Sequence, residues 1–220
     1  MEKNRASRII AVVALCVALL GVSVGFAAWS ATLVISGAKT NVSQGDEAAS
    51  FTNLLTFGTP TCTPSGSGAS ATNVGSLDSA KHTWSGATVS LSKPGDYVTC
   101  TSTVSNASAF IAYIKGIDIA NAITCSNTTS GQAVTGACNS LKLTVTAEAG
   151  SKTSTATAQG STVTDATGIT GSGIPAKTGS TPGTGTISFK IEYVSGGTIS
   201  DADFTATLPT MTFSISTLDS

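Results

Sequence analysis

Apolar and polar residues alternate with a period of two through most of the chain after residue 30. In residues 186–194, Ile187, Phe189, Ile191 and Tyr193 fall on one face, and polar residues fall on the other. This alternation predicts a strand with one buried face. Similar patterns predict further strands over residues 31–36, 87–91, 97–104, 110–119, 141–147, 203–208 and 211–217.

Helical periodicity is weak by comparison. No segment after residue 30 has the long amphipathic pattern and end caps of a helix, and only residues 71–84 suggest a short one. Two stretches, 58–76 and 149–185, consist mainly of small and polar residues and are predicted to be loops. The longer stretch is predicted to be a loop insertion in the domain. A hairpin around residues 162–164 is the alternative to a loop there. About eight short strands joined by such turns predict a single all-β domain over residues 28–220, jelly-roll-like or a β-sandwich.

The first 27 residues have the layout of a signal peptide. Basic residues precede an apolar run that extends from Ile9 to about Ala28, and small residues surround the expected cleavage point after Ala27. A retained transmembrane helix is the alternative, because about 20 apolar residues are enough to span a bilayer. Both interpretations place the rest of the chain outside the cytoplasm, and cleavage predicts a secreted protein.

Four cysteines follow the predicted signal peptide: Cys62, Cys100, Cys125 and Cys138. An even number in an exported chain predicts two disulfides, with three possible pairings. Pairing Cys125 with Cys138 would close a polar, glycine-containing loop and leave Cys62 with Cys100. A zinc site is the alternative, but it needs close cysteine pairs or nearby histidines, and His82 is the only histidine.

Composition excludes several classes of protein. Ser and Thr supply 67 of the 220 residues, whereas charged residues make up only 10% and the net charge is −1. A disordered chain pairs low hydrophobicity with high net charge, a coiled coil is rich in charged helix formers, and a nucleic-acid binder has a basic surface. We therefore expect no nucleic-acid partner, and contact with a membrane only through the signal segment during export.

The sequence offers no recognisable catalytic constellation. It contains neither a G-x-S-x-G nor an H-E-x-x-H motif, and His82 lies in a polar stretch typical of an exposed loop. Asp201 and Asp203 form a close carboxylate pair but supply too few oxygens for a calcium site. We therefore predict no enzyme, cofactor or metal site. Three N-x-[ST] sequons make Asn41, Asn106 and Asn127 candidates for glycosylation, if the source organism glycosylates exported proteins.

Two segments carry a more specific pattern. In residues 26–37, FAAWSATLVISG, the end of the apolar run is followed by an aromatic residue, a strand and a glycine. Residues 91–119 hold a strand, the turn Lys93-Pro94-Gly95-Asp96, a second strand, an Asn-containing turn and another strand. Together these segments resemble the TasA/camelysin family of exported β-proteins. The resemblance implies a jelly-roll-like subunit of extracellular fibres, in a biofilm matrix or on a cell surface.

The resemblance also implies a mode of assembly. In such fibres the N-terminal strand of one subunit completes the sheet of the next, so that an open edge is satisfied by main-chain hydrogen bonds. Residues 28–42 would be the donor strand here, and Trp29, Leu33 and Ile35 would supply its alternating side chains. The expected partner is therefore a second copy of the same chain, in a homopolymer. The alternative is an ordinary first strand paired within its own subunit.

Two other functions are compatible with the sequence. A pilin-like subunit would keep its apolar N-terminus as a helix in a filament core. A monomeric surface module would instead bind a carbohydrate or a protein through residues 149–185.

Overall fold

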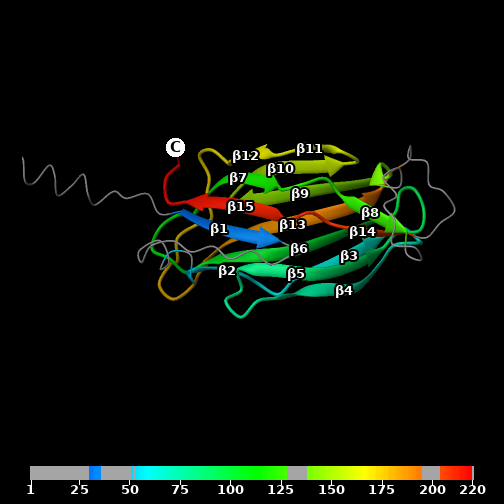
Figure 1. Cartoon of the computed structure of the whole chain (residues 1–220). Coiled ribbons are helices and arrows are strands. Elements are labelled where there is room, and N and C mark those ends of the chain that lie inside the picture. The colour runs from blue at the N-terminus through cyan, green and yellow to red at the C-terminus, as the bar shows by residue number, and fades with distance from the viewer. Residues whose placement is uncertain (1–29, 36–50, 52, 128–137, 195–203, 220) are drawn as a thin grey trace, which may run out of the picture.

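The computed structural model describes residues 30–35, 51, 53–127, 138–194 and 204–219. Every secondary-structure element in these ranges is a β-strand, as the alternation of residues predicts. The strands form two large sheets and one small one (Figure 1). The prediction of an all-β domain is therefore confirmed. The predicted signal peptide, residues 1–27, lies outside the described residues.

The first large sheet, sheet A, has six strands. Their order across the sheet is β12 (Ala166–Thr167), β7 (Tyr113–Ile119), β15 (Met211–Ser216), β1 (Ser30–Ile35), β5 (Thr83–Ser90) and β4 (Ser70–Leu77). Although β1 comes first along the chain, it lies in the middle of this sheet. It runs antiparallel to β15 and parallel to β5.

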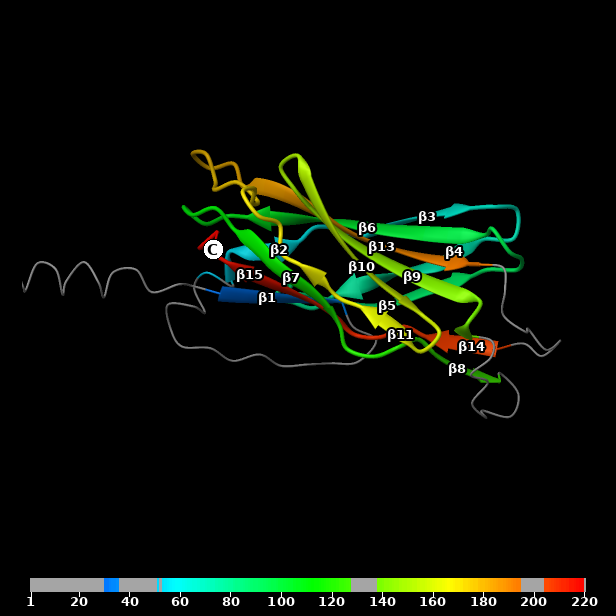
Figure 2. The ribbon, with the colours of Figure 1, turned by 90° about the horizontal axis from the view of Figure 1, so that it is seen from above.

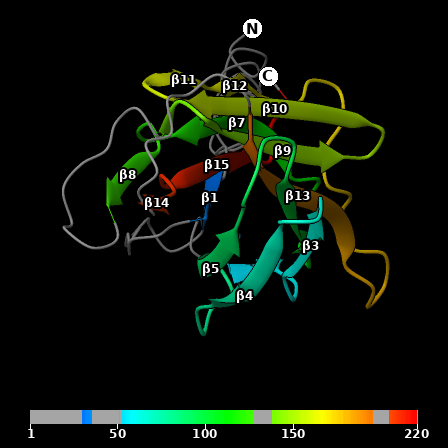
Figure 3. The ribbon, with the colours of Figure 1, turned by 90° about the vertical axis from the view of Figure 1, so that its right-hand side faces the viewer.

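The second large sheet, sheet B, has seven strands. Their order is β11 (Thr162–Thr164), β10 (Lys152–Gln159), β9 (Leu141–Ala149), β13 (Gly183–Tyr193), β6 (Tyr97–Asn106) and β2 (Leu55–Phe57), with β3 (Thr61–Ser65) also paired to β6. The sheet twists strongly, so that β10 crosses the direction of β6 at a steep angle (Figure 2). The small sheet, β8 (Thr124–Asn127) with β14 (Phe204–Thr207), projects from one side of the sandwich (Figure 3).

The core lies between sheets A and B. Alternate residues of β6, beginning at Val98, are buried, while those between them face outward. Trp84 of sheet A and Phe189 of sheet B meet across the interior, with ring centroids 5.1 Å apart. The indole N–H of Trp84 donates to the carbonyl of Val74 at 2.8 Å, so this buried polar group is satisfied. Gly75 is required beside it, because a Cβ there would lie 2.6 Å from the indole nitrogen.

Two disulfides cross-link the domain. Cys62 of β3 bonds to Cys100 of β6, its register partner in sheet B, and Cys125 of β8 bonds to Cys138, just before β9. The structure thus selects one of the three possible pairings, and the zinc alternative is wrong. By loop-closure entropy alone, separations of 38 and 13 residues correspond to about 4 and about 3 kcal/mol respectively.

Hydroxyl groups dominate the outer face of sheet B. One row of register partners crosses five strands of the sheet: Thr61, Thr101, Ser188, Thr146 and Thr155. These residues alternate with buried neighbours such as Phe189 and Val145, so their side chains point away from the core. Charges on this face are sparse, and Lys190 there pairs with Glu192 at 2.7 Å while lying over the ring of Tyr97.

The prediction that residues 149–185 form a long loop insertion is wrong for much of the stretch. β10 and β11 pair with each other inside it, which confirms the alternative of a hairpin around 162–164, and β12 joins sheet A. The buried face of β10 consists of Ala156 and Ala158, which bury little area and leave only a weak apolar signal in the sequence. Beyond the strands, Ile169 and Ile174 are buried against the core.

The predictions of a loop over residues 58–76 and of a short helix within residues 71–84 are both wrong. β3 and β4 occupy most of the first stretch, and β4 pairs with β5. The turn between β4 and β5 is fixed by Asp78, whose carboxylate accepts from the backbone N–H groups of His82 and Thr83. A carboxylate that binds backbone N–H groups in this way competes with helix formation.

Candidate functional site

Three features of the described residues are candidates for function: the place of β1 in sheet A, a polar depression near the β10–β11 turn, and the Lys93–Asp96 turn. In the part of the chain that the structure describes, no three His, Cys, Asp or Glu residues lie close enough to hold a metal ion. Asp201 and Asp203 lie outside the described residues. Over the same described ranges, no helix is long and apolar enough to cross a membrane.

The space that β1 fills between β15 and β5, called here the β1 slot, has a strand edge on either side. β1 makes six register pairs with β15, the last of which sets Ile35 opposite Met211. Its other edge pairs with β5 at Val34–Thr83 and Ile35–Trp84. β1 is therefore the strand that joins β15 to β5, and removing it would expose the main-chain groups of both neighbours.

The proposed donor residues can be placed in this register only in part. Leu33 lies opposite Phe213 and Ile35 opposite Met211, and both partners are buried. Trp29 lies outside the described residues, as do the rest of residues 28–42 apart from β1. Within this single chain, β1 pairs with its own sheet, as expected of an ordinary first strand.

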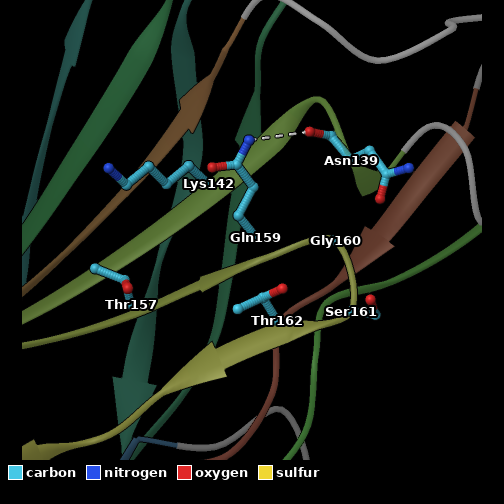
Figure 4. Close-up of a pocket in the computed structure, with 7 residues that line it drawn as sticks. All are labelled: Asn139, Lys142, Thr157, Gln159, Gly160, Ser161 and Thr162. Carbon is cyan, nitrogen blue, oxygen red and sulfur yellow. Dashed lines mark hydrogen bonds between the residues drawn. The ribbon is translucent and has the colours of Figure 1, made fainter.

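The polar depression lies beside the turn between β10 and β11 (Figure 4). It has a volume of about 560 Å³, and its lining consists of hydroxyl, amide and ammonium groups, from Asn139, Lys142, Thr157, Gln159, Gly160, Ser161 and Thr162. The side-chain amide of Gln159 donates to the backbone carbonyl of Asn139 at 3.3 Å. These described lining residues offer hydrogen bonds to a polar ligand, and none of them is a histidine, a cysteine or an acidic residue.

The Lys93-Pro94-Gly95-Asp96 motif forms a tight turn with a structural role. The N–H of Asp96 donates to the carbonyl of Lys93 at 3.1 Å, and Gly95 has a φ of 91°, as the third position of a type II turn requires. The Asp96 side chain is 1% exposed and accepts from the backbone N–H groups of Ser92, Lys93 and Gly68. The turn is thereby fastened to the loop between β3 and β4.

This arrangement changes the acidity of Asp96. Desolvation by burial acts to raise the pKa of the carboxyl group, but the N–H donors of Ser92, Lys93 and Gly68, aided by the charge of Lys93, outweigh it. The pKa is consequently lowered from its ordinary value of 3.8. Because the carboxyl group is more acidic in the folded chain than in the unfolded one, it stabilises the fold above the unfolded-state pKa.

We expect the free energy of unfolding to decrease as pH falls from about 4 through the lowered pKa of Asp96. An Asp96→Asn variant should be less stable near neutral pH and should lose less stability over this acid range, since it has no carboxylate to protonate. Urea unfolding followed by circular dichroism at a series of pH values measures both effects. Parallel pH profiles for the two proteins would show that Asp96 does not contribute.

Asn106 is a structural residue and not a glycosylation site. Its side chain is fully buried; the amide nitrogen donates to the carbonyls of Phe110, Ile174 and Pro175, and the amide oxygen accepts from Ser108. A glycan needs this same nitrogen, so the candidate at Asn106 is wrong for the folded protein. Of the other two candidates, Asn41 lies outside the described residues, and Asn127 ends β8 with its backbone paired to Phe204.

The Asn106 network also explains where β7 begins. The alternation predicts a strand from residue 110, but β7 starts at Tyr113 because Asn106 and Ser108 hold the carbonyl of Phe110 in a turn. Phe110 and Ile111 are consequently exposed. His82, expected in an exposed loop, is half-buried in the β4–β5 turn, and within the described chain its Nε2 has no hydrogen-bond partner.

Comparisons of the chain with protein-family models, with curated proteins and with solved structures gave no match. The functional proposal therefore rests on the residues and the geometry of this chain.

Proposed function

We propose that this protein is a secreted structural subunit of an extracellular fibre, in which the N-terminal strand of each copy completes sheet A of a neighbour. The observation that carries the proposal is the place of β1: the first described strand lies in the middle of sheet A, between β15 and β5. The β1 slot, which this strand fills in its own chain, offers the same register partners on β15 and β5 to the N-terminal strand of another copy. Exchange of identical elements between copies is a low-cost route to assembly.

The length of the chain around β1 supports this proposal. Residues 36–50 connect β1 to the rest of the domain, and 15 residues reach at most about 50 Å when extended. That length is sufficient for β1 to enter a neighbouring copy while remaining attached to its own domain. The scarcity of charge agrees with assembly, because charged side chains on strand edges act against edge-to-edge pairing.

The two disulfides support the proposed location outside the cell. Two disulfides persist in oxidising compartments and are rare in the cytosol. They fasten β3 to β6 and β8 to the start of β9, so neither one ties β1 to the domain. A subunit built in this way keeps a cross-linked body and an N-terminal strand free of covalent bridges.

A pair of substitutions in β1 tests the proposal. In the chain that begins at Ala28, Leu33→Asp places a carboxylate opposite the buried Phe213, whereas Thr32→Asp places it opposite the exposed Ser214. We expect negative-stain electron microscopy to show filaments for the parent chain and for Thr32→Asp, and none for Leu33→Asp. A peptide of residues 28–36 added to a chain lacking those residues should restore its folded circular dichroism spectrum.

A parent chain that stays monomeric, or filaments in both variants, would contradict the proposal.

The polar depression favours the second candidate function, a monomeric surface module that binds a carbohydrate or a protein. That function would be supported by a monomeric parent chain whose binding to glycans is lost in Gln159→Ala.

A further inference from the structure

Exposed apolar side chains gather at one end of the sandwich. Among the large apolar residues that are exposed in the described chain, Val74 lies within β4. The others are Leu54, Phe110, Ile111 and Leu218, with exposed fractions between 37% and 48%. We call these four residues the apolar end. Exposed apolar side chains that gather in one place often mark a surface that binds another molecule or a membrane.

Strand ends and turns bring the four residues of the apolar end together. The carbonyl of Leu54, just before β2, accepts from the N–H of Ala107, just after β6, at 2.8 Å. Phe110 and Ile111 follow in the turn between β6 and β7. Leu218 comes after the end of β15, which pairs with the start of β7. The group therefore draws on both sheets at the same end of the sandwich.

β1 begins at this end as well. Its first residue, Ser30, pairs with Ser216, the last residue of β15, so the two strand ends lie side by side (Figure 1). Ser216 also pairs with Tyr113, the first residue of β7. The chain consequently enters sheet A beside the apolar end.

The sequence before β1 constrains what this end faces. The apolar run from Ile9 ends at about Ala28. Both interpretations of the run predict that it enters a bilayer, because a signal peptide does so before cleavage and a transmembrane helix stays there. Since two residues span at most about 7 Å, Ser30 lies near the lipid surface while the run is attached. We therefore expect the end of the sandwich that carries Ser30 to face the membrane.

Charged groups lie close to the apolar end. Lys177 is exposed, and its N–H donates to the carbonyl of Ser108 in the β6–β7 turn. The ammonium group of the exposed Lys152 donates to the carbonyl of Thr170. The carboxylate of Asp219, next to Leu218, accepts from a backbone N–H. Lysines beside exposed apolar side chains suit the interface of a bilayer that contains anionic lipids.

We propose that the apolar end rests on the lipid bilayer while the N-terminal run is attached, with Phe110 and Ile111 entering the boundary between headgroups and acyl chains. Their apolar surface leaves water on entering this boundary. Attachment through a short segment keeps the lipid at a high effective concentration, so a weak contact is sufficient. This inference is independent of the fibre proposal, which concerns the chain after cleavage.

Quenching by brominated lipids measures the contact. The full chain carries Trp29→Phe, which reduces background emission, together with either Phe110→Trp or the control Val74→Trp. It is reconstituted into vesicles of phosphatidylcholine and phosphatidylglycerol, with or without bromine on the acyl chains. We expect a loss of emission in brominated vesicles for Phe110→Trp and none for Val74→Trp, because Val74 lies in β4. Equal emission of Phe110→Trp in both kinds of vesicle would overturn the proposal and leave the fibre proposal standing.

A longer connection separates docking from simple tethering. A long Gly/Ser linker inserted directly after Ala28 lets the domain turn freely relative to the bilayer. In this chain Phe110→Trp should still be quenched, and adding Ile111→Asp should remove the quenching whereas adding Val74→Asp should not. Circular dichroism checks that both Asp variants fold. Quenching that disappears with the linker alone would show that the apolar end has no affinity for lipid. Dimers without quenching would assign it to contacts between copies, and either result would refute the proposal.

Discussion

Asn106→Asp should prevent stable folding at neutral pH. The substitution replaces an amide that donates to the carbonyls of Phe110, Ile174 and Pro175 with a carboxylate that can only accept. A buried, uncompensated charge costs about 3–5 kcal/mol, which is comparable with the whole stability of a modest domain. The midpoint of urea unfolding, followed by circular dichroism, measures the loss.

The control for this prediction is Asn139→Asp, which makes the same chemical change at an exposed position. Surface substitutions of this kind usually change stability by no more than about 0.5 kcal/mol. Ser108→Ala should fall between the two, because it removes one donor to the amide oxygen of Asn106 and leaves the amide nitrogen with its carbonyls. Equal unfolding midpoints for the two Asp variants would show that the Asn106 network does not hold the loop.

Trp84→Ala should lower the free energy of unfolding by about 3–5 kcal/mol. The indole is fully buried, packs against Phe189 and lines a surface recess of about 200 Å³, so its removal would enlarge a hollow that already exists. It would also leave the carbonyl of Val74 without its donor. Thermal and urea unfolding of the variant and the parent chain give the difference.

Val74→Ala is the matched control, because the side chain of Val74 is exposed although its carbonyl accepts from Trp84. We expect a change of no more than about 0.5 kcal/mol there. A Trp84→Phe variant should lose less than Trp84→Ala, since it keeps an aromatic ring against Phe189 and loses only the indole hydrogen bond. A small effect of Trp84→Ala would mean that the two sheets close over the vacated space.

The sequence predicts those strands that place large apolar residues on one face. β13 is the clearest case: Ile187, Phe189 and Ile191 are spaced two apart and are all buried. The same alternation does not predict β10, because its buried residues are alanines between threonines. Its stability comes from pairing with β9 over its whole length. A strand that depends on its neighbours carries little signal of its own.

The candidate sites depend even more on contacts between distant parts of the chain. The turn at residues 93–96 is recognisable from Pro94 and Gly95, but nothing nearby in the sequence indicates that Asp96 binds the N–H of Gly68. The recess that Trp84 lines is formed by β5, β13 and the segment before β15, which are separated by about a hundred residues in places. Strand order across a sheet, which creates such a site, is a long-range property.

The hydroxyl rows on sheet B also bear on how this protein responds to ionic strength. Added salt screens interactions between charges on a protein surface, and exposed ion pairs contribute little to stability in any case. The described outer face of sheet B presents mainly threonines and serines, and its charged residues include Lys142, Glu148 and the partly exposed pair Lys190–Glu192. We therefore expect the free energy of unfolding, measured by urea unfolding at low and at high salt, to change little with ionic strength.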